Sequence, residues 1–315
     1  MKQVTTILAI LVGFTMNGQW SYNSNWTGVQ ASTCTASGDY STAMGDGTTA
    51  SGDYSTSMGR STAASALYST AMGYGTDASG YFSTAMGSST TASALYSTAM
   101  GDGTIASGSR STAMGSYTTA SDYASLSIGR YNSVNKTVTA GGSAASFDTD
   151  NAAFVIGNGT GSSTKSDAFV VYFNGNATLS GDLTINSDER LKDNIQPLGS
   201  TLNKLHQIEG KTYSFKKDEE HTPKIGVLAQ EVQAVFPELV TEGGDGILSV
   251  NYQGLVPVLI NAINEQDAKM SEQDAKMSEQ EVKMSEQDAK IAALEEMVRF
   301  LAVQQSQTTS SVAAN

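Results

Sequence analysis

The sequence of 315 residues predicts a mainly β protein that ends in an α-helical segment. Two repeats and one change in composition support this prediction. A 14-residue repeat rich in Ser, Thr, Ala and Gly occupies the first half of the chain, and a seven-residue repeat rich in Glu, Gln and Lys occupies the last part. Between them the composition changes sharply, since no glutamate occurs before Glu189. We therefore expect a domain boundary close to residue 187.

The overall composition excludes several functional classes. The net charge is −13 at pH 7, so a basic surface for nucleic acid is not expected. A single cysteine, Cys34, excludes an intramolecular disulfide framework and a Cys-rich zinc site. The two histidines, His206 and His221, leave little for a His-based metal site. We therefore expect no cofactor, no metal and no nucleic-acid partner.

Residues 1–19 have the shape of a secretory signal peptide. Lys2 precedes an apolar run at 7–14, and a basic start followed by a short apolar region is typical of such signals. This run is too short to span a bilayer, and no other segment reaches that length. Gly18 is small, as a signal cleavage site requires, whereas Met16 at the −3 position is not. The alternative to a signal peptide is that this apolar run forms a buried first strand. We expect a mature protein without a membrane span, secreted or at the cell surface.

The repeat rich in Ser, Thr, Ala and Gly fills residues 29–150, which form the expected head. The pentapeptide Ser-Thr-Ala-Met-Gly begins at Ser41 and recurs with small changes, at a constant interval, as far as Ser125. At half that interval, a series of Ala or Ser residues runs through the whole head. The series consists of Ala43, Ala50, Ser57, Ala64, Ala71, Ala78, Ala85, Ala92, Ala99, Ala106, Ala113, Ala120 and Ser127.

The composition of this repeat favours short strands over a coiled coil. Each unit carries a glycine after its Met or Ile, and Ser, Thr and Tyr are common, all of which disfavour helix interiors. Short β-compatible runs separated by glycine turns fit better. The Ala and Ser series would then point into a narrow solenoid, while the other Thr and Ser residues face water. Such a coil needs stacked neighbours, and several chains side by side would bury more surface.

The repeat resembles the head repeats of trimeric autotransporter adhesins. That resemblance implies a left-handed parallel β-roll with three chains to a head and no catalysis. Adhesins of that class end in a membrane-embedded β-barrel, whereas this sequence ends at 310–315 after an expected helix, so self-export through its own barrel is not expected. A structural spacer is the main interpretation of the head. The alternatives are a face that binds a glycan or a cell-surface ligand, and Thr rows matched to an ice-like or mineral surface.

Residues 151–186 are expected to form a β-rich neck. Three short apolar runs, at 153–157, 168–173 and 183–185, have the composition of strands. The sequence Asn174-Gly175-Asn176 predicts a turn between the second and third runs.

Four segments follow the neck in a fixed order and spacing, at 186–195, 225–232, 236–240 and 250–259. Through these segments, residues from about 187 to 270 resemble the intramolecular chaperone auto-processing domain that ends phage tailspikes, endosialidases and fibres. We expect the domain itself to span residues 187–258. One departure is Phe215, where Trp is common, and it should affect packing more than chemistry.

The resemblance implies a self-cleaving serine peptidase that acts once, in cis, with a Ser-Lys dyad. Ser187 would be the nucleophile, Lys192 the general base, and Asn186–Ser187 the scissile bond. A serine hydroxyl is a poor nucleophile until a base accepts its proton, and a lysine accepts one only when neutral. Burial in a trimer interface would favour the neutral amine. Asp188 and Arg190 belong to the same motif, and either orient the dyad or pair across subunits.

The alternative for this motif is structural. Ser187 would cap a helix with acidic residues in its first turn, and the module would be a chaperone that stays attached.

Residues 259–304 are expected to form a parallel coiled coil, followed by a disordered tail at 305–315. The heptad pattern already starts at Val256, and a lysine at g is followed five residues later by an acidic residue at e, as in parallel coiled coils. The pattern does not decide between dimer and trimer, but both resemblances favour a homotrimer. The a positions are Val256, Ile263, Met270, Met277, Met284, Ile291 and Val298; the d positions are Leu259, Gln266, Gln273, Gln280, Gln287, Leu294 and Leu301; the g lysines are 269, 276 and 283; and the acidic e residues are 274, 281 and 288.

Taken together, these features predict a secreted homotrimeric fibre or adhesin-like protein. Its C-terminal chaperone would drive assembly and then cleave itself off at Ser187. The alternatives are an uncleaved structural or adhesive surface fibre and a virion tail fibre, the latter disfavoured by the signal-like N-terminus. A membrane-released transcription factor is less favoured, because a basic DNA-binding region and a membrane span are lacking. A protease acting on other proteins is less favoured, because the nucleophile adjoins its own scissile bond.

Overall fold

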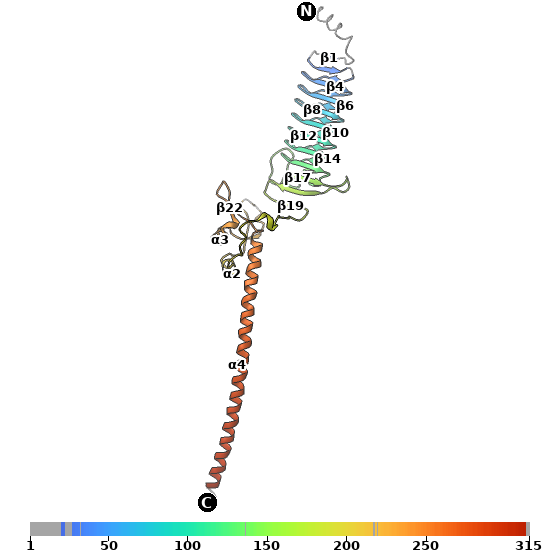
Figure 1. Cartoon of the computed structure of the whole chain (residues 1–315). Helices are drawn as coiled ribbons and strands as arrows, with labels where there is room; N and C mark the ends of the chain where they lie inside the picture. Colours follow the sequence, from blue (N-terminus) through green and yellow to red (C-terminus); the bar gives the residue numbers. More distant parts are fainter. Residues whose placement is uncertain are drawn as a thin grey trace, which may run out of the picture. The chain divides into compact units, whose positions relative to one another are not determined.

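The computed structural model shown in Figure 1 describes residues 20–22, 27–31, 33–135, 137–216, 218 and 220–312. The expected signal peptide, residues 1–19, lies outside the described residues. The chain forms two compact units, which adjoin in sequence at the Asn186–Ser187 peptide bond. We call them the N-terminal unit and the C-terminal unit.

The N-terminal unit is a β-solenoid, as the repeat predicts. Strands of five residues alternate along the chain with strands of two residues, and each kind stacks in parallel into its own sheet. Neighbouring strands in each sheet are offset by one repeat unit, so that Thr84 pairs with Thr98 and Ala85 with Ala99. The five-residue strands are β4 (Thr42–Asp46), β6 (Thr56–Arg60), β8 (Thr70–Tyr74), β10 (Thr84–Ser88), β12 (Thr98–Asp102), β14 (Thr112–Ser116) and β16 (Leu126–Arg130). The two-residue strands are β3 (Thr35–Ala36), β5 (Thr49–Ala50), β7 (Ala63–Ala64), β9 (Asp77–Ala78), β11 (Thr91–Ala92), β13 (Ile105–Ala106) and β15 (Thr119–Ala120).

The interior of the solenoid is built from small side chains. Every member of the predicted Ala and Ser series is buried with 0% exposure, which confirms that the series points inward. Such a narrow interior excludes larger side chains, because interiors pack to near-crystalline density.

The expectation that the other Ser and Thr residues face water is wrong for two further rows, which are buried as well. The serine row begins at Ser41 and the threonine row at Thr48, and each row has one member in every repeat unit. Several of these serines donate to the carbonyl oxygen three residues earlier, for example Ser69 Oγ to Ala66 O at 2.7 Å. The turn backbone thus satisfies these serine hydroxyls, which would otherwise be costly to bury. Six other hydroxyls of the two rows are buried without a hydrogen-bond partner among the described residues: those of Thr48, Ser55, Thr76, Ser83, Thr90 and Thr104.

One turn in each of five successive coils carries an exposed aromatic ring, whereas Arg110 and Ala124 occupy the equivalent turn of the last two coils. The five aromatic residues have left-handed backbone angles, with φ of 56° or 57°. Each ring stacks on the next, with ring centroids 4.9–5.1 Å apart, which compensates for the unfavourable backbone. The column consists of Tyr40, Tyr54, Tyr68, Phe82 and Tyr96.

The expected neck continues the larger sheet. Strand β17 (Ala152–Asn158) pairs in parallel with β16, and β18 (Asp167–Tyr172) and β19 (Ala177–Leu179) add in antiparallel order. The predicted turn lies between β18 and β19, with Gly175 at a φ of 90°. The run at 183–185 forms no strand; it is exposed and has no partner strand among the described residues. At the other end of the sheet, β1 (Trp20–Tyr22) pairs in antiparallel order with β2 (Val29–Ala31), and β2 pairs with β4.

The loop between β16 and β17 closes the solenoid with buried polar groups. Asp122 has 0% exposure and accepts hydrogen bonds from the backbone nitrogen of Thr139 at 2.7 Å, from its Oγ1 at 2.6 Å and from the backbone nitrogen of Ala152 at 2.7 Å. The side chains of Asn132 and Asn135 bond to backbone groups of Thr119 and Ser121, in and directly after β15, the last strand of the smaller sheet. This polar cap satisfies strand groups that have no further coil to pair with.

The C-terminal unit begins with a small α/β fold. Along the chain, the hairpin β20–β21 follows the short helix α2, and the hairpin β22–β23 follows the short helix α3. Its core consists of Val232, Phe236 and Val258, the last of which belongs to the long terminal helix. The elements are η1 (Glu189–Leu191), α2 (Leu202–Leu205), β20 (Lys211–Tyr213), β21 (Lys224–Gly226), α3 (Ala229–Val235), η2 (Pro237–Leu239), β22 (Val240–Glu242) and β23 (Leu248–Val250).

The terminal helix α4 (Leu255–Val312) is a single helix of 58 residues. It includes residues 305–312, for which the sequence predicts a disordered tail. No Gly or Pro interrupts that stretch, and its glutamines are good helix formers. Along α4 the apolar a and d residues are exposed in the single chain, from Val256 to Leu301. Among the described residues, no helix is both long and apolar enough to cross a membrane.

Candidate active site

A single turn of 3₁₀ helix brings the two predicted catalytic side chains together. Ser187 precedes η1 and Lys192 follows it, so their side chains lie on the same side of the turn. Lys192 Nζ donates a hydrogen bond to Ser187 Oγ at 2.7 Å. The pair therefore has the contact that proton transfer between nucleophile and base requires.

The turn is fixed by Asp188 and Arg190. Asp188 is the N-cap of η1, and its Oδ1 accepts a hydrogen bond from the backbone nitrogen of Arg190 at 2.9 Å. The Arg190 guanidinium also donates to both carboxylate oxygens, with Nη2 2.6 Å from Oδ2 and Nε 3.0 Å from Oδ1. The Arg190 side chain lowers the pKa of Asp188, and the Asp188 carboxylate raises the pKa of Arg190. The cap that the structural alternative assigned to Ser187 is thus made by Asp188.

In the single chain this motif is fully open to solvent. Every residue from 187 to 200 is exposed, including Ser187 and Lys192. Within the described part of the chain, the hydrogen bonds of residues 187–198 link them only to one another. We call residues 187–198 the arm. A low-dielectric surrounding for the Lys192 amine is therefore not provided by one copy of the chain.

Residues 199–201, which directly follow the arm, attach it to the N-terminal part of the long helix. Glu265 on α4 accepts hydrogen bonds from Thr201 N at 2.6 Å and from Ser200 Oγ at 2.8 Å. Asn261 Nδ2 also donates to the carbonyl oxygen of Gly199 at 3.1 Å. The backbone hydrogen bond from Thr201, followed by that from the Ser200 hydroxyl, lowers the pKa of Glu265. These contacts join the base of the arm to α4.

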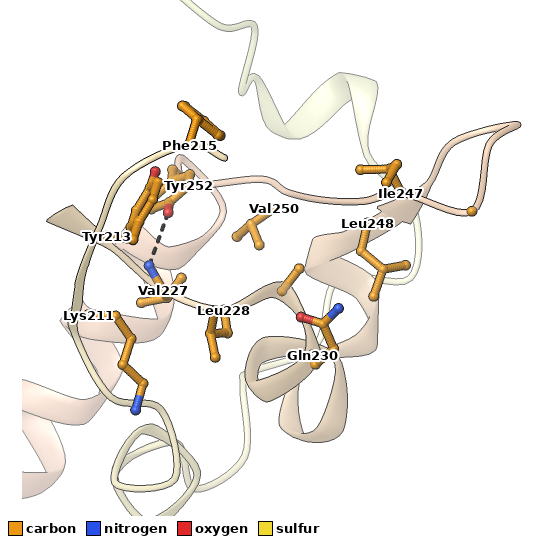
Figure 2. Close-up of a pocket in the computed structure, with 12 residues that line it drawn as sticks. Lys211, Tyr213, Phe215, Val227, Leu228, Gln230, Ile247, Leu248, Val250 and Tyr252 are labelled. Carbon is orange, nitrogen blue, oxygen red and sulfur yellow. Dashed lines mark hydrogen bonds between the residues drawn. The ribbon is translucent and has the colours of Figure 1, made fainter. Parts of the chain in front are cut away.

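A cavity of about 380 Å³ lies between the two hairpins and the start of α3 (Figure 2). Most of its lining is apolar, and Tyr252 Oη accepts a hydrogen bond from the backbone nitrogen of Val227 at 3.2 Å across one side. Phe215, the noted departure from the family pattern, is part of this wall. Sequence reasoning missed this pocket, because its residues are scattered over four segments without a common period. The lining includes Lys211, Tyr213, Phe215, Val227, Leu228, Gln230, Ile247, Leu248, Val250 and Tyr252.

The single cysteine and His206 are not part of the predicted dyad. Cys34 is buried in the solenoid, and His206 ends α2. Within the part of the chain that the structure describes, no three His, Cys, Asp or Glu side chains are grouped so as to hold a metal ion.

Comparison with known families gives two separate matches. Residues 187–241 match the family described as chaperone of endosialidase. Segments 36–62, 50–76, 78–104 and 106–132 match the YadA head domain repeat. Both resemblances stated from the sequence are confirmed.

Similar characterised proteins include phage fibre proteins. The long tail fiber protein Gp37 of Escherichia phage AR1 is 39% identical over 97 residues, which cover 28% of this chain and 9% of that protein. A probable tail fiber protein of Escherichia phage Phieco32 is 34% identical over 90 residues, which cover 27% of this chain and 12% of that protein. The chain thus spans only a small part of the length of these relatives.

Proposed function

We propose that this chain is a subunit of a homotrimeric fibre whose C-terminal unit drives assembly and then releases itself by cutting the Asn186–Ser187 bond. The observation that carries the proposal is the 2.7 Å contact between Lys192 Nζ and Ser187 Oγ, because Ser187 is the first residue after the peptide bond at which the two compact units adjoin in sequence. The match to the endosialidase chaperone over 187–241 and the tail-fibre relatives support it.

The cleavage follows from the chemistry of a serine and a neutral amine. Lys192 Nζ takes the proton from Ser187 Oγ, which attacks the carbonyl carbon of Asn186. The Asn186–Ser187 C–N bond breaks, and the Ser187 nitrogen takes a proton and becomes a free α-amino group. Water then hydrolyses the ester left on Oγ. The products are a chain that ends in the Asn186 carboxylate and a fragment that begins at Ser187.

Two exposed apolar surfaces support assembly from identical chains. On α4, the a and d residues at both ends of the heptad array are aliphatic and half exposed, as in Leu259, Ile263, Ile291 and Leu294. Packing these residues against parallel copies would form a coiled coil and set the three chains in register. On the solenoid, a methionine row that includes Met58 and Met100 is also partly exposed. Parallel copies would bury both surfaces.

Cleavage after assembly would make the assembled fibre kinetically stable. Parallel β-structure built from several chains is slow to find its register, and a helical bundle aligns the chains first. The exposed dyad requires burial to favour the neutral amine, so cleavage would await the assembled state. Once the C-terminal unit is removed, the fibre cannot unfold by the route through which it formed and is kinetically trapped.

Intact mass measurement of the expressed protein tests the proposal. Wild type should give two fragments, one ending at Asn186 and one beginning at Ser187, whereas Ser187→Ala should stay whole. Lys192→Arg is the sharper variant, since arginine keeps a donor for Ser187 Oγ but stays charged and cannot act as a base. Lys216→Ala, an exposed lysine of the same unit, is the control and should be cleaved normally. A single full-length species in wild type would leave a chaperone that stays attached.

The same measurement bears on location. The relatives favour the tail fibre of a virion, while the Lys2 and apolar 7–14 pattern favours a secreted fibre. A large fragment that begins at Met1 supports the virion fibre, and one that begins near residue 20 supports secretion. Both assignments place the mature protein outside the cell that makes it. A glycan or cell-surface ligand for the solenoid stays a prediction.

A further inference from the structure

The C-terminal unit carries an exposed apolar segment and an exposed apolar pocket, which could bind one another. The first is the arm, where Leu191 is 71% exposed, Ile195 56% and Leu198 46%. The second is the pocket of Figure 2, where Ile247 is 64% exposed, and Leu228 is exposed as well. Isolated exposed apolar residues are ordinary, but an apolar pocket and an apolar segment together indicate an interaction site.

The two surfaces do not meet within one copy of the chain. None of the residues that line the pocket belongs to the arm, and every arm residue is exposed. The length of the arm does not prevent contact. Leu191 lies nine residues before the anchored Ser200, and an extended chain of that length reaches roughly 30 Å.

We infer that the pocket of each C-terminal unit binds the arm of a neighbouring copy, so that the cleavage site is completed in trans. This inference rests on the proposed assembly of parallel chains through α4. The base of the arm is attached to Glu265 on α4, and the pocket wall at Val250 and Tyr252 directly precedes the same helix. The base of the arm and the pocket wall are therefore both joined to the N-terminal part of α4.

The geometry of a parallel coiled coil brings these surfaces within reach of each other. Glu265 lies ten residues after Leu255, the first residue of α4, which is about 15 Å along the helix axis at 1.5 Å per residue. Neighbouring helix axes are about 8–10 Å apart. Measured between axes, Glu265 on one helix is then roughly 17 Å from the start of the next helix, and the extended arm reaches roughly 30 Å.

Docking of the arm would also change the surroundings of the dyad. Lys192 follows Leu191 directly, so burying Leu191 in a neighbour's apolar pocket would remove water from the amine. An amine in such a setting is more readily neutral and can take the proton of Ser187. The structure thus offers a reason why cleavage would require a second copy.

Cross-linking tests the inference without relying on cleavage. All chains carry Cys34→Ala and Ser187→Ala, so that the thiol is removed from the solenoid and the chain stays whole. One tagged chain carries Leu191→Cys and a second, differently tagged chain carries Ile247→Cys; both positions are exposed, so neither change should disturb folding. After co-expression and treatment with a short bis-maleimide, we expect a covalent product that contains both tags. In the control, Ile225→Cys replaces Ile247→Cys, because Ile225 is 86% exposed and lies outside the pocket lining.

The outcomes distinguish trimer assembly from docking of the arm in a neighbouring copy. A trimer by sedimentation that gives the mixed product with Ile247→Cys but not with Ile225→Cys supports docking in trans. A trimer that gives no mixed product, or gives it equally in both pairs, overturns the inference and leaves the trimeric fibre standing. A monomeric chain overturns both.

A complementation experiment tests the docking of the arm a second time, with self-cleavage as the measured activity. One chain carries Leu191→Asp, which disables the arm, and the other carries Leu228→Asp, which disables the pocket. Expressed singly, neither should be cleaved. Co-expressed, the chain with the intact arm should be cleaved in the pocket of the other, whereas absence of any rescue in mixed trimers would count against docking between copies.

Discussion

Substitution of Gly87 by alanine tests how the solenoid coils are held together. Gly87 lies in β10 opposite Gly101 of β12, and its φ is +122°, a region that L-residues rarely adopt. An added Cβ would lie 2.0 Å from the carbonyl oxygen of Gly101. That oxygen belongs to the backbone of the next coil, so the clash can be relieved only by separating the two strands.

The loss of stability can be worked out from these two effects. A residue held in a sparsely populated backbone region costs about 1–3 kcal/mol. Separating the strands removes at least two ladder hydrogen bonds, each worth about 0.5–1.5 kcal/mol net. Together, Gly87→Ala should lower the free energy of unfolding by about 2–6 kcal/mol per chain, a large share of the 5–15 kcal/mol that is typical of a domain.

Gly47→Ala is the matched control. Gly47 has a φ of +62°, and an added Cβ meets nothing within 4 Å. The equivalent position of the next coil is occupied by Ser61 at a φ of 53°, so a side chain is tolerated there. We expect a loss of about 1 kcal/mol. Urea titrations followed by far-UV circular dichroism, at one chain concentration and in the Ser187→Ala background, would measure both. Equal losses at the two glycines would refute the stacking argument.

Three further predictions concern the cap and the C-terminal unit. Asp122→Ala leaves the amide of Thr139 and the buried amide of Ala152 without an acceptor and should lower stability by about 2–5 kcal/mol in the same titration; an unchanged midpoint would contradict the cap. Arg190→Ala loosens the turn at the dyad and should slow cleavage about tenfold or more by time-resolved mass measurement, without lowering the melting temperature; an unaltered rate would show that Arg190 does not position it. Glu265 has a lowered pKa, so its contribution is present above the pKa of an unfolded glutamate and is lost as pH falls through the folded value. The melting temperature of Glu265→Gln should therefore lie below that of wild type at pH 7, and the difference should shrink below about pH 4.5; a constant difference would refute the assignment.

Periodicity made the solenoid predictable from sequence. The Ala and Ser series at Ala43 and its equivalents has a fixed phase, and only small side chains fit a narrow interior, so direction and burial follow together. The buried rows that begin at Ser41 and Thr48 could not be predicted in the same way. Where their hydroxyls are satisfied by turn carbonyls, as at Ser41 and Ser69, that geometry appears only when the backbone path is known.

The candidate site was predictable in its residues but not in its surroundings. The spacing from Ser187 to Lys192 is local, so a single turn fixes the contact and the family resemblance identifies both residues. The pocket depends on residues from Lys211 to Tyr252 that approach only in the folded unit. The role of Glu265 as an anchor likewise depends on its contact with Thr201, which lies in a distant segment of the sequence. Neither feature has a local sequence signature.

The central claim is that the chain cuts itself at Asn186–Ser187 only after assembly, and the dependence of cleavage on chain concentration tests it most directly. Freshly refolded wild-type protein would be diluted over a wide concentration range, and the fragment beginning at Ser187 followed by intact mass, with oligomeric state measured in parallel. We expect the rate to rise with concentration, to level off where the trimer is complete, and to be zero at every concentration for Lys192→Arg. The same cleavage rate at concentrations where the chain is monomeric would contradict the claim.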